Sequence, residues 1–473
     1  MNTYLFYDLE TTGLNRTFDQ VIQFAAIRTD RNLDPLEEHN LTIRLRPDVI
    51  PSPAAMLTHG ISIADLAADP CEFDAITTIH RFFNTPATVT VGYNSLGFDD
   101  EFLRFAFYRN LLPPYTHQYA NGCYRMDILA LVVIYWLYNR EVLQWPDNAG
   151  QPSIKLEHIN GLNQLAEGPA HDALVDVRAT VELARRLKSA PKVWEYLAGH
   201  FDKHTDIQRM EALPVSFESA AGSHTLGLLA ASSLGFKHNF QAPVLSIGVS
   251  RAYRNQTLWL RLDLPELQAT EPDSIAAHTW VVRKKAGEPG FILPPRERYW
   301  EKIGPERKAI AENNLRWLQD NPDIFTAIIQ YHADFRYPEI PDLDVDAALY
   351  QSGFWSSADQ ANCRAFHAAP VEEKEPLIRR FKDPALRQLA RRVLFRNFAE
   401  SKSTLKLQVE ADTFRQKVVP PPGTPGMLDF RGHERRTPAR ALGEIKTLTA
   451  TGELDAERRH LLAALKTYIT DNF

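Results

Sequence analysis

Two acidic residues end an otherwise apolar run near the N-terminus, and they constrain the fold more than any other feature of the sequence. Residues 4–10 read Tyr-Leu-Phe-Tyr-Asp-Leu-Glu, which is the composition of a buried β-strand. Side chains two positions apart on a strand point to the same face, so Asp8 and Glu10 form a pair of carboxylates. Burying two like charges costs free energy unless a cation neutralises them. The strand therefore ends either at a cation site or at a solvent-exposed edge.

The first 190 residues alternate between strand and helix patterns, which predicts an α/β unit. Short polar turns separate the first three expected strands, so we expect an antiparallel meander there. Pro113-Pro114 stops the helix that precedes it. The expected strands are residues 4–10, 21–28, 41–46 and 88–93, and the expected helices are residues 61–66, 73–83, 99–110, 128–138 and one that begins near residue 171.

The pattern changes beyond residue 195. Apolar residues alternate with small or polar ones over 245–249 and again over 258–264, and a polar stretch separates the two runs. This pattern predicts a β-hairpin and, with residues 280–283, a small β-rich domain. Residues 305–318 have a helical pattern. Residues 350–473 are expected to be mostly helical, with a loop at the proline-rich stretch 418–423.

Two further acidic segments follow the first strand. Gly92-Tyr93-Asn94 leads through a short turn to Asp99, which begins a predicted helix. His171-Asp172-Ala173-Leu174-Val175-Asp176 begins the last helix of the α/β unit. Each segment alone also has a structural explanation, because Asp is a favoured N-cap and acidic side chains are favourable near a helix N-terminus.

In this order the acidic segments resemble the DEDDh 3′→5′ exonuclease superfamily, and the matching residues are Asp8, Glu10, Asp99, His171 and Asp176. Four such carboxylates can hold two Mg²⁺ ions, with Mn²⁺ as a substitute, on either side of a scissile phosphate. Oxygen ligands suit these ions better than zinc. Histidine titrates near neutrality, so His171 suits the general base that takes a proton from the attacking water.

Within that superfamily the chain resembles bacterial exonuclease I. The resemblance rests on residues 6–11, 23–30, 92–94, 98–101, 107–110, 155–158, 171–173, 344–350 and 353–354. It implies a ribonuclease H-like (DnaQ-like) exonuclease domain with a mixed sheet at residues 1–192. An SH3-like β-rich domain at 193–345 and a helical C-terminal domain at 346–473 would follow, and together they would form a C-shaped clamp around the strand.

The resemblance also implies contacts to the substrate strand, at Glu10, Arg104, Tyr115, Tyr119, Lys155 and His171. Lys155 stands where arginine is usual, and it keeps the positive charge without the bidentate geometry of a guanidinium. Tyr115 and Tyr119 could stack on bases, or they could simply pack beside the neighbouring prolines.

A protein partner follows from the resemblance as well. Members of the exonuclease I family bind the acidic, Phe-ending C-terminal tail of the single-stranded DNA-binding protein through a basic-rimmed apolar pocket in the β-rich domain. Arg307 and Lys308 are the residues that we predict for part of this rim.

The composition sets further limits. The formal net charge is −6, so a nucleic-acid surface must be local. Residues 376–406 carry nine basic and two acidic residues, which predicts phosphate contacts, although basic helix faces are often only solvated. Three widely spaced cysteines suit a reducing cytosol. Without a signal-peptide pattern or an apolar run of about 18 residues, we expect a cytoplasmic protein without a membrane span. The clamp that the resemblance implies needs no second subunit, so we expect a monomer.

The sequence thus predicts a 3′→5′ exodeoxyribonuclease that degrades single-stranded DNA to 5′-mononucleotides, and the resemblance to exonuclease I implies that it acts processively and in DNA repair and recombination. An exoribonuclease with the same catalytic set is one alternative, because the motifs do not report the sugar. A catalytically silent scaffold that clamps single strands is another, although such a scaffold would not need to retain Asp8, Glu10, Asp99, His171 and Asp176.

Overall fold

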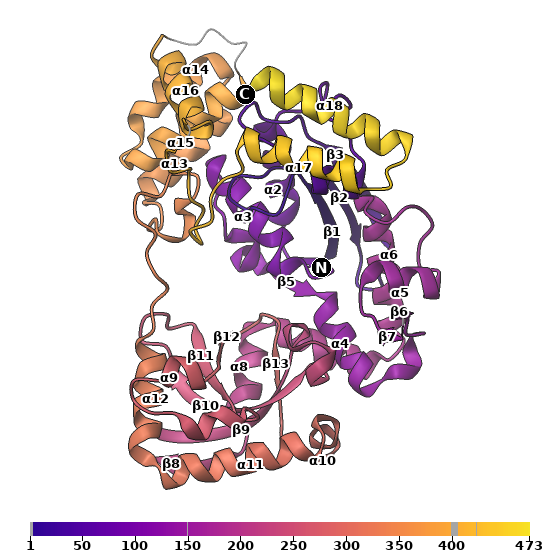
Figure 1. Cartoon of the computed structure of the whole chain (residues 1–473), viewed down its shortest axis with the longest axis vertical. Coiled ribbons are helices and arrows are strands. Elements are labelled where there is room, and N and C mark those ends of the chain that lie inside the picture. The colour runs from indigo at the N-terminus through magenta and orange to yellow at the C-terminus, as the bar shows by residue number, and fades with distance from the viewer. Residues whose placement is uncertain (1–2, 149, 399–404, 422) are drawn as a thin grey trace. The chain divides into compact units, whose positions relative to one another are not determined.

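The computed structural model describes residues 3–148, 150–398, 405–421 and 423–473. The chain divides into two compact units (Figure 1). Unit 1 comprises residues 1–124, 166–178 and 339–473, and unit 2 comprises residues 125–165 and 179–338. The C-terminal helices therefore share a compact unit with the N-terminal sheet. The three domain ranges 1–192, 193–345 and 346–473 stay a prediction.

The N-terminal sheet is mixed and has the strand order β3-β2-β1-β4-β5, of which β1 to β4 belong to unit 1. The central strand β1 pairs antiparallel with β2 and parallel with β4. The mixed α/β exonuclease-type sheet that the sequence predicted is confirmed. The strands are β1 (Thr3–Thr11), β2 (Val21–Thr29), β3 (Pro35–Thr42), β4 (Thr88–Gly92) and β5 (Tyr124–Asp127).

The strand predicted at residues 41–46 is wrong in its position. The observed strand β3 ends at Thr42, and the amide of Ile43 still donates to the carbonyl of Ile22 at 2.9 Å. Beyond it the chain leaves the ladder, because Arg44 N bonds to Pro70 O and Arg46 N bonds to the side chain of Gln20. The apolar alternation there reflects the burial of Ile43 and the packing of Leu45 beyond the last strand residue. Strand β3 itself is largely exposed at the sheet edge and has no apolar alternation to detect.

The helix predicted at residues 61–66 is also wrong. The helix α1 lies earlier, at Pro53–His59, and it ends at Gly60, whose φ of 72° is left-handed. Glycine adopts this conformation without steric cost, so it is a natural helix end. Residues 62–67 form successive tight turns, with i→i−3 bonds such as Leu66 N to Ile63 O. The apolar residues of this segment therefore lie in turns, and not in a helix, where they pack against the hydrophobic cluster of the C-terminal helices.

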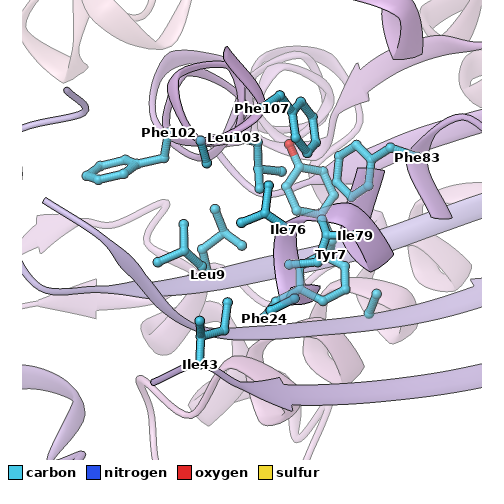
Figure 2. Close-up of a cluster of buried hydrophobic side chains, with 14 of the residues drawn as sticks. Tyr7, Leu9, Phe24, Ile43, Ile76, Ile79, Phe83, Phe102, Leu103 and Phe107 are labelled. Carbon is cyan, nitrogen blue, oxygen red and sulfur yellow. The ribbon is translucent and has the colours of Figure 1, made fainter. Parts of the chain in front are cut away.

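The hydrophobic core of the sheet fixes which face of β1 carries the acids (Figure 2). Tyr7 and Leu9 pack against the helices α2 (Glu72–Phe83) and α3 (Asp99–Arg109), where Phe83 and Phe107 are fully buried. Side chains alternate along a strand, so Asp8 and Glu10 point to the opposite face. The core thereby orients the acid pair.

The C-terminal part of unit 1 is helical, as predicted. Its helices α13 to α15 pack with α2 and α3, and its helices α16 to α18 pack with β2 and α1. The helices are α13 (Ser357–Ala368), α14 (Val371–Leu377), α15 (Pro384–Asn397), α16 (Leu405–Val418), α17 (Pro438–Thr451) and α18 (Ala456–Asn472).

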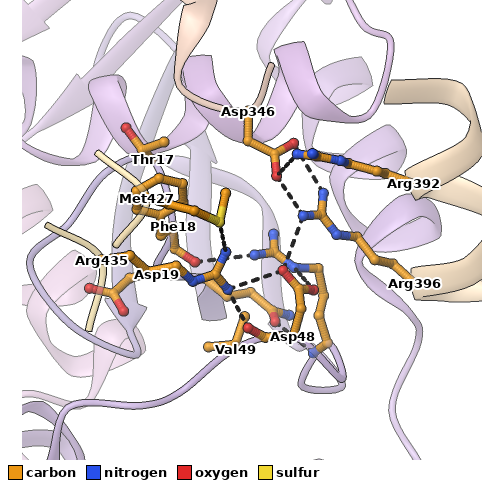
Figure 3. A network of polar contacts seen from close by, with 12 residues as sticks. Thr17, Phe18, Asp19, Asp48, Val49, Asp346, Arg392, Arg396, Met427 and Arg435 are labelled. Carbon is orange, nitrogen blue, oxygen red and sulfur yellow. Dashed lines mark hydrogen bonds and ion pairs between the residues drawn. The ribbon is translucent and has the colours of Figure 1, made fainter. Parts of the chain in front are cut away.

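A buried network of charges ties these helices to the loops around the sheet (Figure 3). Arg396 on α15 pairs with both Asp48 and Asp346, and Arg392 pairs with Asp346 at 2.8 Å. Arg435 donates to Asp48 from the other side, and all of these side chains are almost fully buried. Buried ions are tolerated when each finds partners of opposite charge.

The network corrects part of the expectation for the basic residues at 376–406. Arg392 and Arg396 hold the fold together and do not face solvent. Arg391 pairs with Glu410 on α16. Lys402 and the side chain of Lys406 lie outside the described residues. Phosphate contacts from the remaining basic residues stay a prediction.

Unit 2 contains the predicted β-rich domain and its hairpin. The strand order of its antiparallel sheet is β12-β11-β10-β9-β13, with β8 paired to β9. Across the described parts of the chain, no helix combines the length and apolar character needed to cross a membrane. The strands are β8 (Val215–Ser219), β9 (Gly222–Ala230), β10 (Gln241–Val249), β11 (Gln256–Arg261), β12 (Val281–Lys285) and β13 (Phe291–Leu293). The longer helices are α4 (Ile128–Tyr138), α5 (Leu156–Asn163), α7 (Pro191–Ala198), α8 (Lys203–Glu211), α11 (Pro305–Asp320) and α12 (Pro322–Asp334), while α6 (Ala173–Lys188) belongs to both units.

Removing the central cation of the network should destabilise unit 1. Arg396→Leu leaves Asp48 and Asp346 buried with fewer partners, so we expect the free energy of unfolding to fall by about 3–5 kcal/mol. Arg415→Leu, which removes an exposed pair with Asp412, should change it by less than about 1 kcal/mol. Thermal unfolding of both variants beside the wild type measures the difference.

The loss in Arg396→Leu should depend on pH. Burial alone would raise the pKa of Asp48, but Arg396, Arg46 and Arg435 hold that pKa well below its usual range. A lowered carboxyl pKa contributes stability above about pH 4, and this contribution is lost as the pH falls further. The variant and the wild type should therefore converge in acid. A constant difference down to acid pH would contradict this account of the network.

Candidate active site

The strand β1 presents Asp8 and Glu10 on the face opposite to the core that contains Tyr7 and Leu9. Asp8 pairs in register with Ala25 and Glu10 pairs with Gln23 on β2, so both acids sit within a regular ladder. The register becomes irregular only between Glu10 and Thr11. Asp8 is partly exposed and Glu10 is buried. The ladder with β2 runs past both acids, while the ladder with β4 ends at Phe6, so the acids follow directly after the part of β1 that is bonded on both sides.

Asp99 lies at the start of α3, a short distance along the chain from the end of the neighbouring strand β4. The strand β4 ends at Gly92, where a Cβ atom would lie 2.5 Å from the side chain of Ser95 and 3.2 Å from the carbonyl oxygen of Tyr7. Glycine is therefore required for the turn to pass this close to β1. Asp99 is the first residue of α3, and Phe98 holds the N-cap position without a side-chain bond. The N-cap explanation for Asp99 is not what the structure shows.

His171 and Asp176 come from the start of α6. The carboxylate of Asp172 accepts bonds from Leu174 N at 2.9 Å and from Val175 N at 3.3 Å, so Asp172 caps the helix. Capping by Asp172 leaves the carboxylate of Asp176 to other contacts. His171 has a left-handed φ of 64°, and its amide donates to Asp176 at 3.2 Å. The loop thus holds the histidine beside the aspartate.

The acidic residues and His171 converge on one place. Side-chain ligand atoms of Glu10, His171 and Asp176 all lie within 4.8 Å of one another. Burial, and then the charges of Asp99 and Asp176, raise the pKa of Asp8 well above its usual range. Burial, Asp8, Asp176 and Asp172 raise the pKa of Glu10 to about 9. The carboxylates therefore repel one another across a small space.

This donor set fits divalent cations. Hard divalent ions take carboxylate oxygens as ligands, and their charge would offset the repulsion that raises the pKa values of Asp8 and Glu10. The residues that could hold such ions are Asp8, Glu10, Asp99 and Asp176. His171 is near enough to act on a water molecule bound beside them.

The predicted strand contacts of unit 1 lie on α3 and on the segment that follows it. The guanidinium of Arg104 pairs with Asp100 at 2.5 Å and lies over the ring of Tyr115, 5.8 Å from the ring centroid. Tyr115 is partly buried, and burial raises the pKa of its hydroxyl to about 12. Tyr119 is 64% exposed. Of the two tyrosines, Tyr119 offers the more accessible ring, and Tyr115 is partly buried against the hydrophobic cluster of the C-terminal helices.

The other predicted contacts belong to unit 2. Lys155 is the N-cap residue of α5, and its exposed ammonium lies 3.3 Å from Glu157. Arg307 donates to Asp263 at 2.8 Å and to the carbonyl oxygens of His238 and Gln241. Lys308 is more exposed and pairs loosely with Glu297 at 3.4 Å. Arg307 therefore has a structural function in addition to any role in binding.

Two features near the site had not been predicted. His59, at the end of α1, interacts electrostatically with His171, and burial lowers its pKa to about 4, so it is neutral at physiological pH. The sequence offered no sign of it, because α1 itself was not predicted. Asp100 and His117 form a fully buried pair, with 2.8 Å between Oδ1 and Nε2. An acidic residue directly after Asp99 was the only available sign.

Comparisons with known proteins agree with this geometry. The family described as "Exonuclease" (RNase_T) matches residues 5–184, and the family described as "Exonuclease I C-terminal domain" matches residues 343–472. Exodeoxyribonuclease I of Escherichia coli is 29% identical over 389 residues, which cover 76% of this chain and 78% of that protein. Exodeoxyribonuclease I of Haemophilus influenzae is 27% identical over 441 residues, covering 88% and 90%.

A solved structure extends the likeness to the whole fold. E. coli exonuclease I in complex with a dA16 oligonucleotide superimposes with a TM-score of 0.86 at 25% identity, and the match covers 100% of both chains. A mixed five-stranded sheet with this pattern of acids, matched by the "Exonuclease" family, places the chain among the exonucleases. More narrowly, the chain belongs to the exonuclease I family.

The repulsion within the site gives a stability test. Because the pKa of Glu10 is raised, the cation-free protein should lose stability as the pH rises from about 5 to 9, when this carboxyl must ionise. Glu10→Gln removes that cost and should raise the midpoint of thermal unfolding in a chelator at pH 8.5, with a smaller gain at pH 5. Glu453→Gln, on the exposed surface, is the matched control.

Added Mn²⁺ or Mg²⁺ should stabilise the wild type, because a ligand that binds only the folded state raises the unfolding midpoint. Glu10→Gln should respond much less. Equal stabilisation of the wild type and Glu10→Gln by the cation would place the cation elsewhere.

Proposed function

We propose that this chain is a 3′→5′ exodeoxyribonuclease that hydrolyses single-stranded DNA to 5′-mononucleotides with two Mg²⁺ ions. The observation that carries the proposal is the convergence of Asp8, Glu10, Asp99 and Asp176 with His171 on one face of the sheet. The relatives that match most of the chain are exodeoxyribonucleases I, and a solved relative holds a DNA oligonucleotide. We further propose that it acts as a cytoplasmic monomer in DNA repair and recombination.

The four carboxylates are the proposed ligands of the two ions. Bound there, divalent cations would lower the pKa of a water molecule and offset the charge on the phosphate and on the leaving 3′ oxygen. The protein supplies rigidity, since β1 fixes Asp8 and Glu10 while α3 and α6 deliver Asp99 and Asp176. Preorganised ligands of this kind avoid reorganisation during the reaction.

His171 is the proposed general base. Its ring nitrogen lies within 4.8 Å of carboxylate oxygens of Glu10 and Asp176, next to the place where the scissile phosphate would bind. The bond from its amide to Asp176 keeps the loop in position. The ring is exposed, so it can take a proton from the attacking water and release it to solvent.

The strand upstream of the scissile bond is proposed to lie along Arg104, Tyr115 and Tyr119, with Glu10 and His171 contacting the terminal nucleotide. Tyrosine rings stack on any base, and a guanidinium binds phosphate or stacks on a ring, so these contacts suit sequence-independent degradation. Lys155 is proposed as a further cation for the strand.

A direct assay tests the proposal. With Mg²⁺ and single-stranded DNA labelled at either end, we expect mononucleotide to be released first from the 3′ label. Asp8→Ala should lower the rate about a thousandfold or more, because it removes a proposed metal ligand. Lys466→Ala, which changes an exposed cation on α18, should degrade DNA at the wild-type rate.

The alternatives give different results in the same assay. Faster degradation of RNA of the same sequence would move the assignment to an exoribonuclease. Tight binding of single strands with no hydrolysis of either nucleic acid would indicate a scaffold. Cleavage within the strand would contradict an exonuclease.

A protein partner is proposed from the family. We propose that an acidic peptide ending in Phe, such as the tail of the single-stranded DNA-binding protein, binds near Arg307 and Lys308 on α11. Support comes from the partial exposure of both cations at the start of this helix. Exposed cations at the edge of an interface mainly speed the encounter with an acidic partner and set its salt dependence.

Binding of a fluorescent peptide from this tail tests the partner. Lys308→Ala should weaken binding about threefold to tenfold at low salt and less at high salt. Arg307→Lys is preferable to Arg307→Ala, because alanine would remove a partner of the buried Asp263. Lys446→Ala on α17 is the control. A peptide lacking its Phe that bound equally well would remove this proposal.

A further inference from the structure

The segment between α3 and β5, residues 113–123, carries both predicted tyrosine contacts, and we call it the tyrosine loop. It contains little regular structure beyond two short 3₁₀ turns. Its position must therefore come from tertiary contacts. Which contacts hold the loop decides where the rings of Tyr115 and Tyr119 lie.

The two ends of the tyrosine loop are held mainly through backbone groups. At its start, the carbonyl oxygen of Pro113 contacts the ring of His80 on α2 at 3.1 Å. At its end, Asn121 O accepts from the amide of Ala87 at 2.9 Å, and the thiol of Cys123 contacts Thr85 O at 3.3 Å. Between these ends lies the stretch that carries the two tyrosines.

In the middle of the tyrosine loop, a buried histidine contacts a buried carboxylate of α3. His117 is fully buried, and its Nε2 lies 2.8 Å from Oδ1 of the fully buried Asp100 on α3. The rings of Phe83 and Phe107 contact the imidazole edge-to-face, with centroids 5.7 and 5.8 Å away. His117 follows Tyr115 by two residues and precedes Tyr119 by two residues. The contact of His117 with Asp100 thus lies midway between the two rings.

The same carboxylate also positions the predicted phosphate contact. The other oxygen of Asp100 pairs with Arg104 at 2.5 Å, and Arg104 lies over the ring of Tyr115. Tyr115 in turn contacts Phe354 edge-to-face. Asp100 therefore connects to the loop twice, through His117 and through the stacked Arg104. It is also the residue next to Asp99.

We propose that the buried Asp100–His117 pair is a positioning device for the substrate strand, with His117 as the positioning residue. It holds the tyrosine loop against the helix that carries Asp99, so that the bases upstream of the scissile bond meet Tyr115 and Tyr119 at a fixed distance from the metal site. The pair does not touch the reacting atoms. This inference rests on the proposed function and assigns strand positioning to residues outside the catalytic set.

The physical reason lies in the cost of moving a buried charge. A buried carboxylate that is bonded through both oxygens restricts the positions of its partners, because no water molecule can replace a hydrogen bond that is lost. An aromatic ring without a hydrogen-bonding nitrogen in place of His117 would keep the packing and remove one of the two connections between the loop and Asp100. The tyrosines would then sample more positions, and each stacking contact would be made less often.

His117→Phe separates these effects, because phenylalanine fits among aromatic rings but cannot bond to Asp100. Two substrates report on different parts of the site. A long single strand uses the tyrosines, and the p-nitrophenyl ester of thymidine 5′-monophosphate presents one nucleotide to the metal site. We expect the KM for the strand to rise about tenfold, as for the loss of a base-stacking contact, and ester hydrolysis to stay within about twofold of the wild type.

Two controls separate positioning from general damage to the fold. His200 in unit 2 is likewise fully buried, bonds to the buried Asp206 at 2.9 Å and stacks on Phe291. His200→Phe should cost comparable thermal stability and leave the ratio of the two activities unchanged. His117→Gln, whose amide can still donate to Asp100, should recover most of the strand KM.

A double-mutant cycle gives the decisive comparison. If His117 acts through the loop, Tyr119→Ala should have little further effect in the His117→Phe background, because coupled residues are not additive. Full additivity, an unchanged strand KM, or parallel loss of strand and ester hydrolysis would each overturn the proposal. If the wild type hydrolyses neither substrate, the proposed function fails instead. Anisotropy of a labelled strand without metal then still tests His117, with weaker binding expected in His117→Phe.

Discussion

The mutual repulsion of carboxylates on and around β1 is the constraint on which the rest of the structure depends. Asp8 and Glu10 are brought together with Asp99 and Asp176, and the pKa values of Asp8 and Glu10 rise as a result. An arrangement of like charges does not form spontaneously in a flexible chain. It persists because a hydrogen-bonded central strand and two helices impose it, and because a divalent cation can offset the repulsion between the carboxylates.

Buried hydrogen bonds and ion pairs hold the acidic segments in place against this repulsion. Two buried guanidinium groups hold the loop that follows β1, since Arg46 donates to Phe18 O and Arg109 donates to Thr17 O. Both arginines pair with the buried Glu72. Arg109 belongs to the helix that begins with Asp99, so the same contacts connect two of the acidic segments. The C-terminal helices join this framework through the network around Asp48.

The predictions from sequence succeeded where a local apolar pattern had one physical explanation. They failed where a strand was exposed, or where buried apolar side chains belonged to neither a helix nor a strand. The strand with Asp8 and Glu10, the helix at 128–138 and the hairpin strands were found because their patterns match their surroundings. Strand β3 was missed because an exposed edge strand needs no apolar alternation. The segment 61–66 was mistaken for a helix because Ile61 and Ile63 pack from turns. Arg392 and Arg396 could be read as solvent-facing because the aspartates that bind them lie at distant positions.

The sequence by itself determined the order of the acidic segments and, through that order, the family to which the chain belongs, because few residue types can serve as ligands of a divalent cation. Only the tertiary structure decided that Asp172 caps α6 while Asp176 faces Glu10, and that Asp100 bonds to His117 instead of joining the acid set. Adjacent aspartates are equivalent in a sequence. They differ in the fold because helix geometry and the buried partners around them point each carboxylate in a different direction.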